Sequence, residues 1–186
     1  LYYPKMNREE FNNLIKQSDK TYQVYIFASR MPFPFSVFLH TWIVLVDHED
    51  VSRYDVWGWK KRCETSWGHL HLNLYEPWIG VRKFPSKNSN PNASRSKSFV
   101  LNSIVGAENS LAQKVVDFLK KGQPSYPYIN LYKYFPGPNS NTFTQWVLDE
   151  FPELNFRLPW TAVGKNFKNK AGRQFITSTQ QVDQAL

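Results

Sequence analysis

The fold is decided by the stretch "FLHTWIVLVD", residues 38–47. Its apolar residues fall on both faces of an extended chain, which is typical of a strand that is covered on both sides. The stretch therefore predicts the central strand of a sheet. His40 stands near the start of that strand, at its N-terminal edge.

Four further segments predict strands, because β-branched, aromatic or alternating apolar residues fill them: 21–29, 53–61, 66–75 and 98–105. The segment 53–61 follows a turn and should pair with the central strand in antiparallel fashion. In 66–75 the leucines face one side of the strand, and the other side carries His69, His71 and Asn73. The polar segment 85–97 predicts a surface loop.

Two helices flank this run of strands and have clear start signals. Asn7 and Glu10 have the spacing of a capping box at the start of the first helix. Ser110 is the expected N-cap of the second helix, over 109–122, and Gly122 is expected to close it.

The order of these elements indicates an α+β protein, with helices packed on a central, mostly antiparallel sheet. We expect one domain over residues 1–186, because the chain is too short for two sizeable cores. Its parts are an N-terminal helix at 1–20, a core at 21–167 and a polar tail at 168–186. Within the core, 158–167 is expected to add a short strand or a loop.

The composition limits the partners and the compartment. The formal net charge is +8, but the basic clusters are short and dispersed, which argues against a nucleic-acid or anionic-membrane binder. No run has the length of a transmembrane helix. The single cysteine, Cys63, excludes an internal disulfide and leaves the compartment open. The chain begins at Leu1 rather than Met, which indicates either a trimmed chain or a mature form, and any upstream signal or anchor would lie outside it.

The stretch "PGPNSNTFTQWVL", residues 136–148, is the first candidate for chemistry. Asn139 is the expected N-cap of a third helix that runs to about Phe151, which puts Ser140 at the first helical position. There the unpaired backbone N–H groups and the helix dipole would favour negative charge, as a nucleophile requires. The alternative is that Ser140 only belongs to a helix cap.

His40 could act as a general base at the mouth of a cleft, or it could be a half-buried histidine bonded to backbone. His69 and His71 could supply two metal ligands, but a catalytic zinc usually needs three, and no third stands at a diagnostic spacing. We therefore expect no metal and no other cofactor. His71, His69 or Asn73 could instead orient His40, or could form the polar outer face of a strand.

Several of the motifs resemble an uncharacterised bacterial domain-of-unknown-function family. They are "FLHTWIVL", "YDVWGW", "SWGHLHLN", "YPYINLYKYFPGPNSNTFTQWVL" and "LPWTAVGKNF", and together they cover roughly residues 22–168. The signature of that family is the G-P-N-S-N-T run followed by a helix. The resemblance implies a bacterial source, and an envelope or secreted location if a signal has been removed.

A more distant similarity is to circularly permuted, NlpC-type papain-like enzymes. These place a histidine on an early strand and a nucleophilic cysteine later, at the start of a helix. The analogy implies that His40 is the general base and that Ser140 occupies the nucleophile position, where this chain has serine in place of cysteine. It implies a permuted papain-like architecture for the core.

Two functions follow from these observations. The first is a hydrolase or acyltransferase that acts on an amide, peptide or ester bond. The second is an inactive binding module of the same fold, with an aromatic cleft for a small molecule, peptide, glycan or lipid. The residues expected to line or shape the cleft are Trp42, Trp57, Trp59, Trp67, Asn73, Asn139 and Asn141. The oligomeric state stays open.

Overall fold

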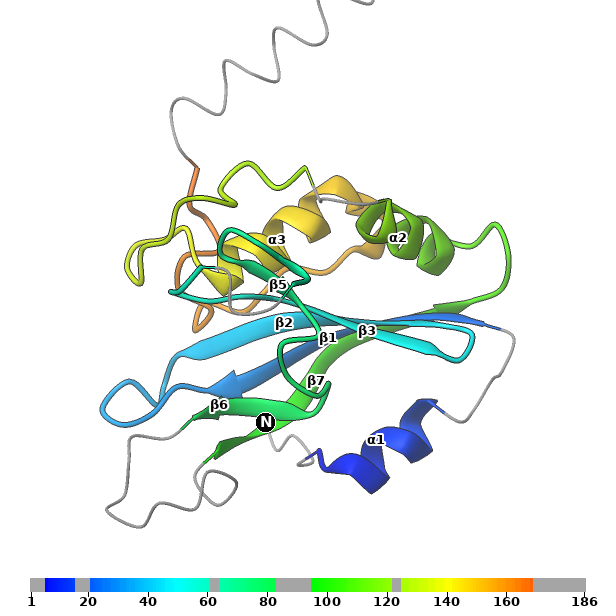
Figure 1. The fold of residues 1–186 in the computed structure, drawn as a ribbon, viewed down its shortest axis with the longest axis horizontal. Coiled ribbons are helices and arrows are strands. Elements are labelled where there is room, and N and C mark those ends of the chain that lie inside the picture. Colours follow the sequence, from blue (N-terminus) through cyan, green and yellow to red (C-terminus); the bar gives the residue numbers. More distant parts are fainter. Residues whose placement is uncertain (1–5, 16–20, 61–63, 83–94, 122–124, 169–186) are drawn as a thin grey trace, which may run out of the picture.

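The central element is the strand β2 (Leu39–Asp47), as the sequence predicts. The computed structural model describes residues 6–15, 21–60, 64–82, 95–121 and 125–168. Within them the chain forms three α-helices and a curled, seven-stranded antiparallel sheet (Figure 1). The α+β class expected from the sequence is therefore confirmed.

The sheet has the strand order β4-β5-β3-β2-β1-β7-β6, and every neighbouring pair is antiparallel. The other strands have these bounds: β1 (Tyr22–Arg30), β3 (Asp50–Val56), β4 (Ser66–Trp67), β5 (Leu70–Leu72), β6 (Ile79–Arg82) and β7 (Arg95–Gly106). β2 lies fourth of the seven, so neighbouring strands cover both of its edges. Its continuous apolar pattern reflects that position.

Helices cover both faces of the sheet (Figure 1). On one face, α2 (Leu111–Lys120) and α3 (Ser140–Glu150) bury apolar residues against Ile26, Ile43 and Tyr54. On the other face, Phe11 of α1 (Arg8–Ile15) packs among Phe27 and other aromatic and aliphatic side chains. A short 3-10 helix, η1 (Pro152–Leu154), follows α3.

The β2–β3 pair opens at one end, and this opening shapes the site described below. The two strands pair regularly from the turn at Asp47–Asp50 as far as Ile43 and Tyr54. On its other edge β3 pairs with β5 through Tyr54, Asp55 and Val56, so beyond Tyr54 only this edge of β3 is paired. The sequence predicted that residues 53–61 pair with β2. Their last residues do not pair with β2, and the strand ends at Val56.

The expected strand at 66–75 is a short hairpin in the structure. Gly68 has a φ of +60°, a left-handed conformation that reverses the chain between β4 and β5. A side chain at Gly68 would collide with the backbone oxygen of Ile129, 2.2 Å from an added Cβ. His69 therefore lies in a turn, and Asn73, with a φ of +55°, lies past the end of β5.

The helix starts follow the sequence closely. Asn7 and Glu10 exchange the two hydrogen bonds of a capping box, and the Ser110 side chain accepts from the Gln113 backbone N–H. Asn139 caps α3, which ends at Glu150. Gly122, expected to close α2, lies outside the described residues.

Three expected segments lie at the margins of the core. Residues 158–167 contain no strand and form turns, which is the loop alternative of the expectation. The expected loop at 85–97 lies mostly outside the described residues, and its last part opens β7, where backbone pairing with β6 extends the strand. The tail at 169–186 also lies outside the described residues.

Candidate active site

Ser140 is the first residue of α3, and the local sequence builds this helix start firmly. The Asn139 side chain accepts hydrogen bonds from the backbone N–H groups of Asn141 and Thr142, and the Thr142 hydroxyl accepts from the Asn139 N–H. The Asn139 amide in turn donates to the carbonyls of Tyr134 and Val163. Ser140 is thus held in a fixed and buried position, with 4% of its surface exposed.

The helix start is anchored to the beginning of β2. Asn141 donates from its side chain to the carbonyl of Leu39, 2.9 Å away. The Thr41 hydroxyl contacts the side chains of Asn141 and Thr144 at 2.9 and 3.0 Å. These bonds bring together two segments a hundred residues apart in the chain. They place Ser140 beside His40, which lies between Leu39 and Thr41.

His40 contacts Ser140 directly: its Nδ1 atom lies 2.9 Å from the Ser140 Oγ. On the other side of the ring, His40 Nε2 lies 2.9 Å from Asp55 Oδ1. The three side chains form a continuous Ser140–His40–Asp55 hydrogen-bonded chain. Each is at least nine-tenths buried. The order of the three groups is the same as in the nucleophile, base and orienting acid of serine hydrolases.

Asp55 reaches His40 because β2 and β3 separate at this end. If the register of the two strands continued, Asp55 would face Trp42 directly across the ladder. Because the β2–β3 ladder stops at Tyr54, Asp55 has no ladder partner on β2, and its Oδ1 atom lies against His40 Nε2 instead. The Trp57 ring packs on His40, with 4.4 Å between ring centroids, and holds the imidazole in place.

Asp55 is ionised in this setting, although it is fully buried. Burial alone raises the pKa of a carboxyl, but the attraction of His40 and Arg53 and the hydrogen bonds that they donate outweigh it. The pKa of Asp55 therefore lies below its ordinary value. Its second oxygen accepts from Arg53 at 2.6 Å and from the indole N–H of Trp57 at 2.8 Å.

Arg53 is itself locked in place, which fixes Asp55 from behind. Its guanidinium is buried, donates to the carbonyls of Glu76 and Ile79, and lies 4.2 Å from the Trp42 ring centroid. A buried carboxylate requires such a partner, because an unpaired charge in the interior is strongly destabilising.

The protonation pattern of His40 follows from these partners. An ionised carboxylate only accepts, so His40 Nε2 carries the proton that is shared with Asp55. In the neutral ring Nδ1 is then the acceptor, and it faces the Ser140 hydroxyl. The ring is turned the opposite way from that in chymotrypsin-like enzymes, where Nε2 faces the serine. The chemical roles of the two nitrogens are nevertheless equivalent.

The helix start provides only one backbone donor for an oxyanion. The N–H groups of Asn141 and Thr142 already bond to the Asn139 side chain, whereas no acceptor among the described residues bonds to the N–H of Ser140. The sequence predicted that several N–H groups of this helix start would be available. The asparagine cap occupies two of them.

A pocket of about 540 Å³ opens onto Ser140 and His40. Aromatic and aliphatic side chains supply most of its wall, and none of the described residues that line it is Asp, Glu, Lys or Arg. Trp57 and Trp59 form part of the wall, as expected, and Asn139 and Asn141 lie at its base. Such a cavity suits an uncharged, apolar group held next to Ser140.

The remaining predicted site residues lie elsewhere. Trp42 is fully buried beneath Arg53, and Trp67 packs against the main core, so neither lines the pocket. Asn73 accepts a hydrogen bond from the backbone of Arg53. The structure thus supplies no cleft contact for these three side chains.

His69 and His71 do not orient His40, because their ring nitrogens bond elsewhere. His69 Nδ1 donates to the carbonyl of Trp57 at 2.8 Å. His71 contacts the Ser66 hydroxyl through Nδ1 at 2.6 Å and the carbonyl of Trp59 through Nε2 at 3.1 Å. Asp55, which sequence reasoning missed, takes the orienting position. Among the described residues, no three His, Cys, Asp or Glu side chains form a group that could hold a metal ion.

The comparison with family models gives one match. The model of "Protein of unknown function (DUF3750)" matches residues 19–167. The chain belongs to the DUF3750 family. The match spans every strand of the sheet, α2, α3 and all three members of the hydrogen-bonded chain. Comparison with curated proteins and with solved structures gave no match. Within the described residues, no helix has the length and hydrophobicity needed to cross a membrane.

Proposed function

We propose that this protein is a hydrolase or acyltransferase that cleaves an ester, amide or peptide bond, with Ser140 as its nucleophile. The observation that carries the proposal is the buried Ser140–His40–Asp55 chain at the base of an apolar pocket. A base early in the chain and a nucleophile at the start of a later helix also support the distant relation to permuted papain-like enzymes.

In the first step the Ser140 Oγ attacks the substrate carbonyl carbon while its proton passes to His40 Nδ1. Asp55 stabilises the imidazolium that forms, because its carboxylate stays ionised and bonded to Nε2. The negative oxygen of the tetrahedral intermediate accepts from the Ser140 N–H, at the positive end of the α3 dipole.

In the second step the bond to the leaving group breaks, and His40 returns its proton to the departing oxygen or nitrogen. The acyl group is now an ester on Ser140. Water, or a second alcohol or amine, attacks this ester, gives its proton to His40 and releases the acyl product, and the proton then returns to the Ser140 oxygen. The choice between water and another acceptor decides between hydrolase and acyltransferase.

One observation favours the second candidate, a binding module without turnover. Only the Ser140 N–H is available at the helix start, and an oxyanion hole usually needs more than one donor. In this alternative the pocket would hold an apolar ligand, and the Ser140 hydroxyl would contribute only a hydrogen bond.

Hydrolysis of p-nitrophenyl butyrate distinguishes the two candidates. We expect the wild-type chain to release nitrophenol with a burst, and Ser140→Ala to lose at least about 1,000-fold in kcat/KM. The matched control is Ser66→Ala, which removes the other serine that contacts a histidine, and it should retain the wild-type rate. Hydrolysis that survives Ser140→Ala, or a wild-type chain that only binds the ester, would reject the nucleophile.

A further inference from the structure

Two loops beside the pocket expose aromatic rings to solvent. The first connects β1 and β2 and contains Phe33, which is 84% exposed, and Phe35. The second precedes α3 and contains Tyr134 and Phe135, the latter 73% exposed. We name these four residues the aromatic rim. Large exposed rings in a cluster mark an interaction surface, because isolated exposure is common but a contiguous apolar patch is not.

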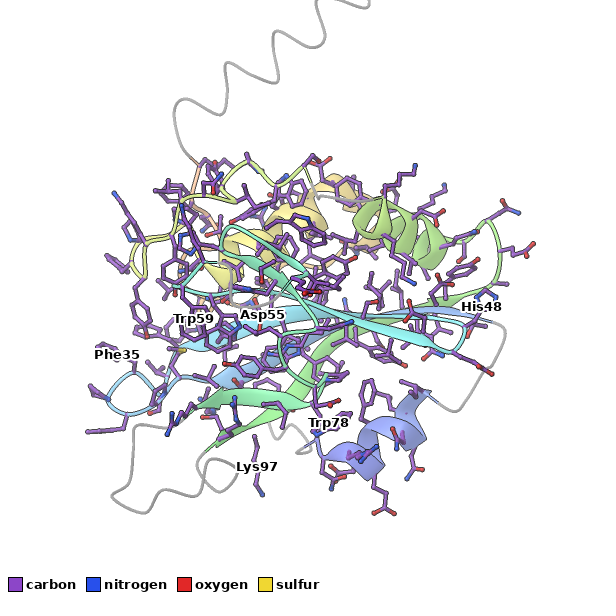
Figure 2. The ribbon with its side chains drawn as sticks, viewed as in Figure 1. Phe35, His48, Asp55, Trp59, Trp78 and Lys97 are labelled. Carbon is purple, nitrogen blue, oxygen red and sulfur yellow. The ribbon has the colours of Figure 1, made fainter. Side chains whose placement is uncertain are left out.

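The two loops form one surface at the mouth of the pocket. Phe35 and Tyr134 pack against each other, with 6.1 Å between ring centroids. Phe35, Tyr134 and Phe135 also line the pocket itself. Figure 2 shows Phe35 at the extremity of the molecule, on the same side as Asp55 and Trp59. The rim therefore surrounds the entrance through which a substrate reaches Ser140.

The charged residues in the chain segments that carry and adjoin the rim are cations. Arg30 is exposed at the end of β1, Lys133 is exposed in the second loop, and Arg157 is exposed in the segment that follows η1. The segments 30–42, 125–148 and 157–168 contain no Asp or Glu. The acidic turn between β2 and β3 lies at the far end of the sheet, where Figure 2 labels His48. The rim loops therefore contribute cations and no acidic side chain.

We propose that the aromatic rim docks on a bilayer that contains anionic lipid, and that the pocket accepts an acyl chain from that bilayer. Aromatic rings partition to the boundary between headgroups and acyl chains, while nearby Lys and Arg are attracted to anionic headgroups. The docking half is independent of catalysis. The acyl half rests on the proposed function, because it names the group that would be carried to Ser140.

The pocket wall favours an acyl chain over a peptide. A bound peptide would bury amide groups that need hydrogen-bond partners. The side-chain amides at the base of the pocket are already committed: Asn139 donates to Tyr134 and Val163, and Asn141 donates to Leu39 and Val163. An acyl chain has only its carbonyl end to satisfy, and that end would lie beside Ser140.

Sedimentation with vesicles tests the docking half, using Ser140→Ala so that no hydrolysis alters the lipid. We expect binding to phosphatidylcholine vesicles that contain phosphatidylglycerol, and weaker binding to phosphatidylcholine alone. Adding Phe33→Ser and Phe135→Ser should weaken binding at least about tenfold. The matched control is Val105→Ser, which removes an exposed apolar side chain of β7 outside the rim.

A charge-reversal pair tests the role of the cations. Lys133→Glu should lower binding to the anionic vesicles, whereas Lys114→Glu, on the exposed surface of α2, should change it much less. The absence of any vesicle binding would overturn the docking surface. Equal loss in both charge variants, combined with unchanged binding of the Phe33→Ser, Phe135→Ser chain, would also overturn it, because net charge alone would then act. Retention on an apolar peptide but not on vesicles would assign the rim to a polypeptide instead.

The acyl half has its own readout. In a series of p-nitrophenyl esters, kcat/KM should rise from acetate to octanoate in the chain with an intact pocket. If kcat/KM does not change with the length of the acyl chain while vesicle binding is retained, the acyl-chain proposal is rejected and the docking surface stands. Vesicle binding without any ester hydrolysis would reject the proposed function and leave the docking surface standing.

Discussion

Among the described residues, two serine hydroxyls contact a histidine ring, and only one of these two pairs has the partners that the proposed catalysis requires. Ser140 and His40 meet at a helix start, and Ser66 and His71 meet across the β4–β5 hairpin. In both pairs the hydroxyl faces Nδ1. The pairs differ at Nε2, which bonds to the Asp55 carboxylate in His40 and to the Trp59 carbonyl in His71.

This difference shows what a nucleophile requires beyond a hydrogen bond. A carboxylate stabilises the imidazolium that forms when histidine takes a proton, and a neutral carbonyl does so far less. Ser140 also stands at the positive end of a helix dipole and borders the pocket, whereas neither Ser66 nor His71 lines it. We therefore expect catalytic effects to follow the first pair, and only local effects on stability to follow the second.

The largest difference is expected between His40→Asn and His71→Asn. Asparagine cannot act as a base, so His40→Asn should lower kcat/KM by about 1,000-fold or more. His71→Asn should keep the wild-type rate per folded molecule, with the folded fraction taken from circular dichroism. Equal losses in the two folded variants would erase the distinction between the pairs.

A smaller but still large effect is expected when the carboxylate of the first pair is removed. Asp55→Asn should lower kcat by about 100- to 10,000-fold, because an amide can force the imidazole into the wrong tautomer. It should also destabilise the fold by about 3–5 kcal/mol, since Arg53 keeps its charge without its buried partner. Urea unfolding and initial rates measure the two effects.

The control for this change is Asp47→Asn, at the opposite end of the same strand pair. Asp47 is partly exposed and bonds to Lys120, so its loss should cost at most about 1 kcal/mol and leave the rate unchanged. A normal rate in Asp55→Asn would show that the Asp55 carboxylate does not assist His40.

The pH dependence of stability should also follow Asp55. Its pKa in the folded chain lies below the unfolded value of about 4, so its contribution to stability is complete above that pH and is lost as the pH falls through the folded pKa. Between about pH 6 and pH 3, the free energy of unfolding should therefore fall more in the wild type than in Asp55→Asn. Parallel curves from urea unfolding at each pH would contradict the ionised, paired state of Asp55.

The smallest effect is expected from the helix caps. Asn139→Ala should cost about 1–2 kcal/mol and should lower the ester rate, because Ser140 loses its fixed position. Ser110→Ala removes the cap of α2 and should cost about 1 kcal/mol or less without changing the rate. Thermal unfolding and initial rates compare the two caps, and equal rates in both variants would show that the Asn139 cap does not position the nucleophile.

The sequence predicted the elements that carry Ser140 and His40 more closely than the contacts between them. Apolar patterning predicted β2 within one residue, and the Asn139 cap predicted the start of α3. These are local signals. The approach of His40 to Ser140, a hundred residues later, came from analogy with the order of parts in papain-like enzymes, because no local pattern encodes it.

Asp55 could have been found from the sequence. Residues 53–61 were expected to pair with 38–47, and that hairpin brings residue 55 close to His40. Instead, His69, His71 or Asn73 was predicted to orient His40, because residues 66–75 were expected to form one strand. The backbone oxygen of Ile129 approaches Gly68 closely at this turn, and neither this approach nor the pairing of β3 with β5 is shown by a local pattern. The aromatic rim likewise depends on two distant loops that meet.

The most direct test of the central claim is labelling with a fluorophosphonate probe, followed by mapping of the modified peptide by mass spectrometry. We expect a single adduct on Ser140, formed by the wild type and by Ser66→Ala, absent from Ser140→Ala, and strongly slowed in His40→Asn. An adduct that persists in Ser140→Ala, or one that maps to Ser66, would contradict it.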